Sequence, residues 1–131
     1  MKLVSSRATD GRGQMRDRQR RDRAMTPLIR ERYPSMTSLQ IDFDFSDDEK
    51  FSPAPQVIVL HPPARAYLIF ACPYGDCDGE FNLSPAVDEL VNSGESQDQG
   101  QLRCSGRRSS GRDTHGSCCL VLEYQLKLQR R

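Results

Sequence analysis

The stretch AYLIFACPYGDCDGEFNL (66–83) consists of an apolar run, a short turn sequence and a second apolar run. Cys72 ends the first run, and Cys77 follows after Pro, Tyr, Gly and Asp. Proline and glycine in such a tetrapeptide favour a tight turn. The stretch therefore predicts a β-hairpin, formed by residues 64–72 and 79–83, whose tip carries two cysteines. These thiols either bind a metal, form a redox or disulfide pair, or pack as small hydrophobic side chains.

A second group of cysteines occupies a similar position later in the chain. Cys104 ends a short strand predicted for residues 101–104, and Cys118 and Cys119 directly precede LVLEYQLKL (120–128). Large apolar residues recur at every second position of this last segment, as in a strand with one buried face. Tetrahedral zinc requires such a layout, because two hairpin tips must each present two thiolates at about 2.3 Å from one ion. We therefore expect a site with four cysteine ligands.

The adjacent residues Cys118 and Cys119 cannot easily both reach one ion, because neighbouring strand residues point to opposite faces. Cys118 shares its face with Leu120 and Leu122, so it is the predicted ligand, and a bulge at the strand start would exchange the two cysteines. The imidazole of His115, in the preceding loop, can replace a thiolate. The predicted ligands of a structural Zn²⁺ ion are Cys72, Cys77, Cys104 and Cys118, with Cys119 and His115 as alternates.

Catalytic zinc sites keep one coordination position open, usually with histidine or carboxylate among three protein ligands. A site closed by four cysteines lacks that position. The sequence also contains no phosphate-binding loop and no His-x-Glu deaminase motif,. We therefore expect that the protein is not an enzyme.

Other elements are predicted from hydrophobic pattern and helix signals. Residues 39–45 (LQIDFDF) alternate between apolar and polar, and residues 56–60 (QVIVL) are mostly β-branched, so both predict strands,. Ser84 as N-cap, Pro85 in the first turn and Gly94 at the end predict one short helix near 85–92. The predicted fold is a small β-rich (α+β) single domain of antiparallel hairpins over residues 37–128.

The order of these elements is strand, cysteine turn, strand, short helix, strand, cysteine loop, strand. It resembles the zinc-ribbon architecture over residues 64–128. The resemblance is one of layout, because four and thirteen residues separate the paired cysteines, whereas zinc ribbons favour two. It implies a structural zinc site and carries no further function to this chain.

The N-terminal segment differs in charge from the rest of the chain. Residues 1–35 carry ten Lys or Arg and four Asp or Glu, a net +6, whereas residues 36–131 carry nine and fourteen, a net −5. The run RDRQRRDRA (16–24) has too few apolar residues to offset the entropy of ordering it,. We therefore expect a disordered basic tail over residues 1–36 and a short C-terminal tail over residues 129–131.

The expected function is that of a protein-interaction or assembly module. We expect it in the cytoplasm and away from membranes, because an odd number of cysteines without a secretory leader or a long apolar segment favours reduced thiols there,. The alternative is a nucleic-acid-binding zinc ribbon that uses the basic tail and Arg103, Arg107, Arg108 and Arg112. The acidic balance of residues 36–131 favours the protein partner, because phosphate binding needs a concentrated basic surface.

Overall fold

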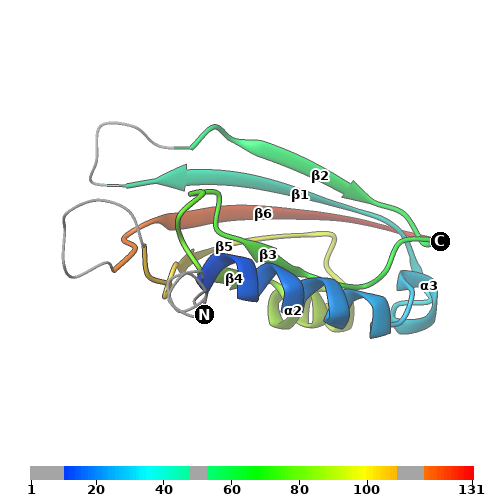
Figure 1. The fold of residues 1–131 in the computed structure, drawn as a ribbon. Coiled ribbons are helices and arrows are strands. Elements are labelled where there is room, and N and C mark those ends of the chain that lie inside the picture. The colour runs from blue at the N-terminus through cyan, green and yellow to red at the C-terminus, as the bar shows by residue number, and fades with distance from the viewer. Residues whose placement is uncertain (1–10, 48–52, 109–116) are drawn as a thin grey trace.

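A four-stranded antiparallel sheet forms one layer of the structure, with the strand order β2-β1-β6-β5. The computed structural model describes residues 11–47, 53–108 and 117–131. The sheet consists of β1 (Met36–Ser46), β2 (Gln56–Leu60), β5 (Gln97–Arg103) and β6 (Val121–Arg130). A second layer lies against one face of this sheet and contains a two-stranded hairpin and helices (Figure 1). The hairpin pairs β3 (Ile69–Ala71) with β4 (Glu80–Asn82).

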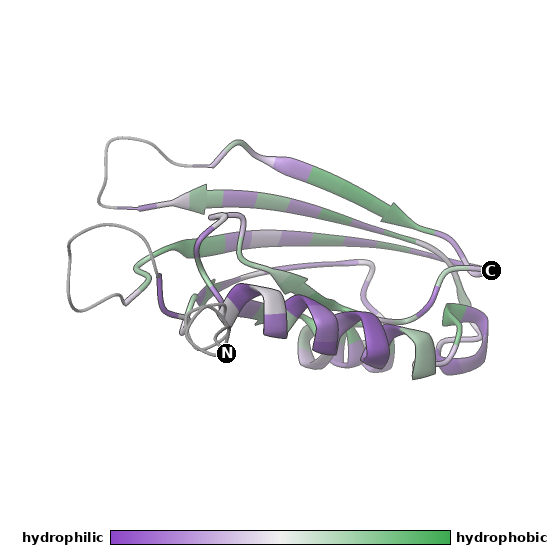
Figure 2. Ribbon diagram, viewed as in Figure 1, coloured by the Kyte–Doolittle hydropathy of each residue, from purple (hydrophilic) through white to green (hydrophobic). Residues whose placement is uncertain are grey.

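The two central strands show the alternation that the sequence predicts. Along β1, Leu39, Ile41 and Phe43 are buried, whereas Asp44 is exposed on the other face. Ile41 lies opposite Leu126 of β6, which is also fully buried. Apolar and polar residues alternate visibly along both strands in Figure 2. The predicted β-rich fold of antiparallel strands is therefore confirmed, and its core lies between the sheet and the second layer.

Helix α4 (Ser84–Ser93) confirms the predicted short helix and buries Val87 and Leu90. Gly94 ends it with a φ of 80°, a left-handed conformation that glycine adopts without strain,. The N-cap is Leu83 rather than Ser84. The helix begins one residue early because the side-chain oxygen of Asn82 accepts a hydrogen bond from the Ser84 amide at 2.9 Å.

The prediction of a disordered tail is wrong for residues 11–36. Helices α2 (Gly11–Met25) and α3 (Ile29–Arg32) occupy most of this segment, and β1 begins at Met36. Although α2 is polar along nearly its whole length (Figure 2), Met15 and Gln19 are buried. The Gln19 amide donates to Glu80 of β4 at 2.8 Å, so contacts with the hairpin stabilise a helix that has little apolar surface of its own. Residues 1–10 lie outside the described residues.

Further boundaries also differ from the predictions. Strand β5 begins at Gln97 rather than at 101, because residues 97–103 all pair with β6. The strand expected over 64–72 is regular only at Ile69–Ala71, because residues 64–66 bond instead to the segment before α3: the Ala66 amide donates to the Pro27 carbonyl at 2.8 Å. The C-terminal residues 129 and 130 belong to β6 rather than to a tail. None of the helices in the described part of the chain is long and apolar enough to cross a membrane.

Candidate metal centre

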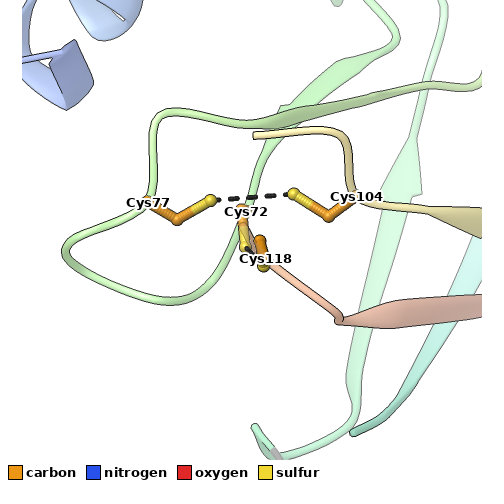
Figure 3. Close-up of side chains that lie close together, drawn as sticks. All are labelled: Cys72, Cys77, Cys104 and Cys118. Atoms are coloured by element: carbon orange, nitrogen blue, oxygen red, sulfur yellow. Dashed lines mark hydrogen bonds between the residues drawn. The ribbon is translucent and has the colours of Figure 1, made fainter. Parts of the chain in front are cut away.

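The hairpin of β3 and β4 and the hairpin of β5 and β6 meet at their tips. Each tip contributes two cysteines (Figure 3). Cys72 follows β3 and Cys77 precedes β4, whereas Cys104 follows β5 and Cys118 precedes β6. All four side chains are buried. The site therefore joins the small hairpin of the second layer to the edge of the large sheet.

The four sulfur atoms form a compact cluster in which every pair lies within 4.8 Å. The sulfurs of Cys77 and Cys104 are 3.6 Å apart, and those of Cys72 and Cys118 are 3.9 Å apart. Four ligands at about 2.3 Å from a tetrahedral zinc ion are separated by about 3.8 Å. A disulfide would require a separation of about 2.05 Å. The cysteines are free thiols, and their spacing fits a tetrahedral metal rather than disulfides.

Backbone amides point at all four sulfurs. In each case the donor is the residue two positions beyond the cysteine, namely Tyr74, Gly79, Gly106 or Leu120. The nitrogen–sulfur distances are 3.2 Å at Cys77 and 3.4 Å at Cys104. Such hydrogen bonds lower the pKa of a thiol and stabilise a bound thiolate. Both tips are thus built in the same way to hold negative sulfur.

Protonation within the cluster is uneven. The hydrogen bond between Cys104 and Cys72 lowers the pKa of Cys104 to about 5. Burial raises the pKa of Cys118 to about 12. The hydrogen bond with Cys104, followed by burial, raises the pKa of Cys72, and burial raises that of Cys77. The surroundings thus favour the thiolate of Cys104 and disfavour the thiolates of the other three cysteines. A divalent cation would supply the charge that allows the other three to ionise.

Two glycines allow the tips to come this close. A Cβ atom built on Gly79 would overlap the Cys104 sulfur, and one built on Gly106 would overlap the backbone of Gly79. A Cβ atom built on Gly75, in the turn between Cys72 and Cys77, would meet no atom within 4 Å. Gly106 was not predicted as part of the site. The sequence pattern that marks it is Cys-x-Gly, which occurs at both Cys77 and Cys104.

Arg12 of α2 forms hydrogen bonds with the backbone of the turn between Cys72 and Cys77. One of its guanidinium nitrogens donates to the carbonyl oxygens of Cys72 and Tyr74 at 2.8 Å and of Cys77 at 2.9 Å. This places a positive charge beside the cluster, where it would partly offset the charge of about −2 on a zinc ion with four thiolates. Arg12 was not predicted as a site residue, because residues 1–36 were expected to form a tail.

The two tips are also tied by direct contacts. The Arg107 amide donates to the Asp78 carboxylate at 2.7 Å. The Arg108 guanidinium pairs with Asp76 at 3.1 Å and lies 4.1 Å from the centre of the Tyr74 ring. The Arg108 side chain therefore contacts the partner turn, whereas Arg107 contacts it through its backbone amide and is itself exposed.

The remaining predicted site residues do not join the cluster. Cys119 is exposed, as expected for the face opposite Cys118. Arg103 is exposed at the end of β5. His115 and Arg112 lie outside the described residues.

The chain matches no known protein family, no curated protein and no solved structure. The layout of two hairpin tips with four buried cysteines is nevertheless consistent with a zinc-ribbon-like site.

Proposed function

We propose that Cys72, Cys77, Cys104 and Cys118 bind one structural zinc ion. The observation that carries the proposal is the spacing of the four buried sulfurs, which lie within 4.8 Å of one another. Tetrahedral sites of four sulfurs select zinc or iron. We favour zinc, because a closed four-cysteine site is typical of structural zinc and requires no redox partner.

The proposed role of the metal is structural rather than catalytic, because four cysteines fill a tetrahedral shell and leave no position for a substrate. The ion would join two hairpins that belong to different sheets. Structural zinc contributes on the order of 10–16 kcal/mol of apparent binding energy in small domains. A domain of this size, with a modest core, gains much of its stability from such a link.

We further propose that the domain is a protein-interaction or assembly module of the cytoplasm, where thiols stay reduced. The support is an apolar surface at the sheet edge: Val57 and Val59 of β2 are 62% and 48% exposed. The alternative of nucleic-acid binding through residues 103–112 has weaker support. Arg108 is already engaged by Asp76 and Tyr74, which leaves its charge partly neutralised,.

Elemental analysis of the purified protein tests the metal proposal. We expect about one zinc ion per chain in the wild type and in Cys119→Ser, and none in Cys104→Ser, because a serine hydroxyl cannot replace a thiolate ligand. Cys119→Ser is the matched control, since the same substitution removes an exposed thiol. Zinc lost from Cys119→Ser and retained by Cys118→Ser would contradict the assignment of ligands.

A further inference from the structure

Strand β2 is an edge strand that lacks the usual protection against pairing. It lies at one end of the large sheet and, among the described residues, pairs only with β1. Its sequence, QVIVL, contains no charged residue. Val57 and Val59 are two of the three exposed large hydrophobic side chains among the described residues, the third being Met25. The opposite edge, β5, carries Asp98, Arg103 and several glutamines. Because edge strands are normally protected by charge, β2 has the properties of a strand-pairing site.

Helix α2 carries a row of arginines along one flank, and the first two of them lie near β2. Arg12, Arg16, Arg20 and Arg23 recur at intervals of four, four and three residues, which places them on one flank of a helix,. Arg12 and Arg16 line a cavity of about 200 Å³ together with Gln56 and Ile58 of β2, so this flank borders the same groove as the edge strand. Within the described residues, Arg16 has no hydrogen-bond or ion-pair partner, and Arg20 pairs only with the exposed Asp17.

Aromatic side chains form the floor of this groove. Phe43 and Phe70 contact each other edge to face, with ring centres 5.1 Å apart, and both line the cavity. The cavity is smaller than the roughly 300–1,000 Å³ of a typical small-molecule pocket. It suits one apolar side chain of a larger partner. The groove therefore combines an open strand edge, an apolar pocket and a basic wall.

We propose that the groove between β2 and α2 binds an extended acidic peptide of a partner protein, which adds to β2 as a further strand of the sheet. One apolar side chain of the peptide enters the pocket over Phe70, and its acidic side chains face Arg16 and Arg20. This inference rests on the proposed function as an interaction module and specifies its surface and its partner. It does not require the bound metal to be zinc.

Two other occupants fit the groove less well. A second copy paired through β2 would bring two arginine-lined flanks of α2 toward each other, and like charges across an interface are unfavourable. Single-stranded nucleic acid binds by stacking bases on exposed rings. Here Phe43, Phe45 and Phe81 are only 4%, 9% and 2% exposed.

A phage-displayed library of random dodecapeptides, panned on the full zinc-loaded chain, tests the proposal. We expect enriched peptides to carry Asp or Glu two residues from an apolar residue, because side chains that face α2 recur at every second position of an added strand. A synthetic enriched peptide should bind in fluorescence anisotropy and lose at least tenfold in affinity to the double variant Arg16→Glu/Arg20→Glu. Arg21→Glu is the matched control, because Arg21 is exposed on the opposite flank of α2. Bound peptide should slow hydrogen exchange of the amides of residues 56–60 and leave those of 97–103 unchanged.

The proposal would be overturned by failure to enrich peptides, by enriched peptides without acidic residues, or by equal losses in Arg21→Glu and the double variant. Tighter binding of oligouridylate, or self-association through β2 in sedimentation, would also overturn it in favour of the other occupants. Zinc content of every sample separates the two proposals. Zinc-loaded protein that binds no peptide contradicts the groove alone, and peptide binding by folded, metal-free protein contradicts the metal site alone.

Discussion

Substituting Gly79 by alanine should damage the metal centre, whereas the same change at Gly75, two residues before Cys77, should not. The added Cβ at Gly79 would lie 2.9 Å from the Gly106 nitrogen and would overlap the Cys104 sulfur. Ordinary contacts begin near 3.5 Å, so the two tips must separate by about 0.6 Å or more. Metal–ligand distances tolerate only about 0.2 Å. At Gly75 the added atom meets nothing within 4 Å.

Overpacking of this kind costs about 1–3 kcal/mol. For the roughly 110 residues that the structure describes, this corresponds to a fall in Tm of about 4–12 °C,. If the whole cost falls on the metal-bound state, zinc affinity drops about 5- to 150-fold, because 1.4 kcal/mol is a factor of ten. Gly75→Ala should stay within about 0.5 kcal/mol of the wild type.

Differential scanning calorimetry and a competitive zinc titration with a chromophoric chelator measure both quantities on the same samples. The close approach of the two tips predicts that Gly79→Ala loses both stability and zinc affinity. Equal Tm values and equal zinc affinities for the two alanine variants would refute the reasoning, because they would mean that the tips do not meet at Gly79.

Three further predictions concern the surroundings of the site. Arg12→Ala should lower the free energy of unfolding by about 2–3 kcal/mol in chemical denaturation, because it removes charged hydrogen bonds to three carbonyls,, and Arg21→Ala should change it little. Zinc binding should weaken steeply, by more than about tenfold per pH unit, as pH falls from 8 to 6, because burial raises the pKa of Cys77 and Cys118 and these thiols must lose their protons to bind the metal,. A zinc titration at stepped pH measures this slope, and a pH-independent affinity would contradict it. Removal of zinc by a strong chelator should speed hydrogen exchange in residues 72–79 and 104–106 much more than in β1, and uniform exchange would argue against a local metal link.

The sequence predicted the strands in which apolar residues at every second position are also the buried ones. Leu39 and Ile41 in β1, and Leu126 and Leu128 in β6, are two residues apart within each strand and are all buried. The same parity argument separates the buried Cys118 from the exposed Cys119. Local signals therefore sufficed wherever one face of a strand packs on the core.

Helix α2 was not predictable in this way, because its stability depends on contacts distant in sequence. Arg12 bonds to carbonyls 60 to 65 residues away, and Gln19 bonds to Glu80. Only Met15 gives the helix a buried apolar side chain. A polar, arginine-rich segment without an apolar stripe is typical of disordered chain, and tertiary contacts override that local tendency here.

X-ray absorption at the zinc edge of the purified protein tests most directly whether four cysteine sulfurs surround one metal ion. We predict a spectrum fitted by four sulfur neighbours at about 2.3 Å, with no nitrogen or oxygen in the first coordination shell. Protein that is folded but free of metal, or a metal bound through nitrogen or oxygen ligands, would contradict the account.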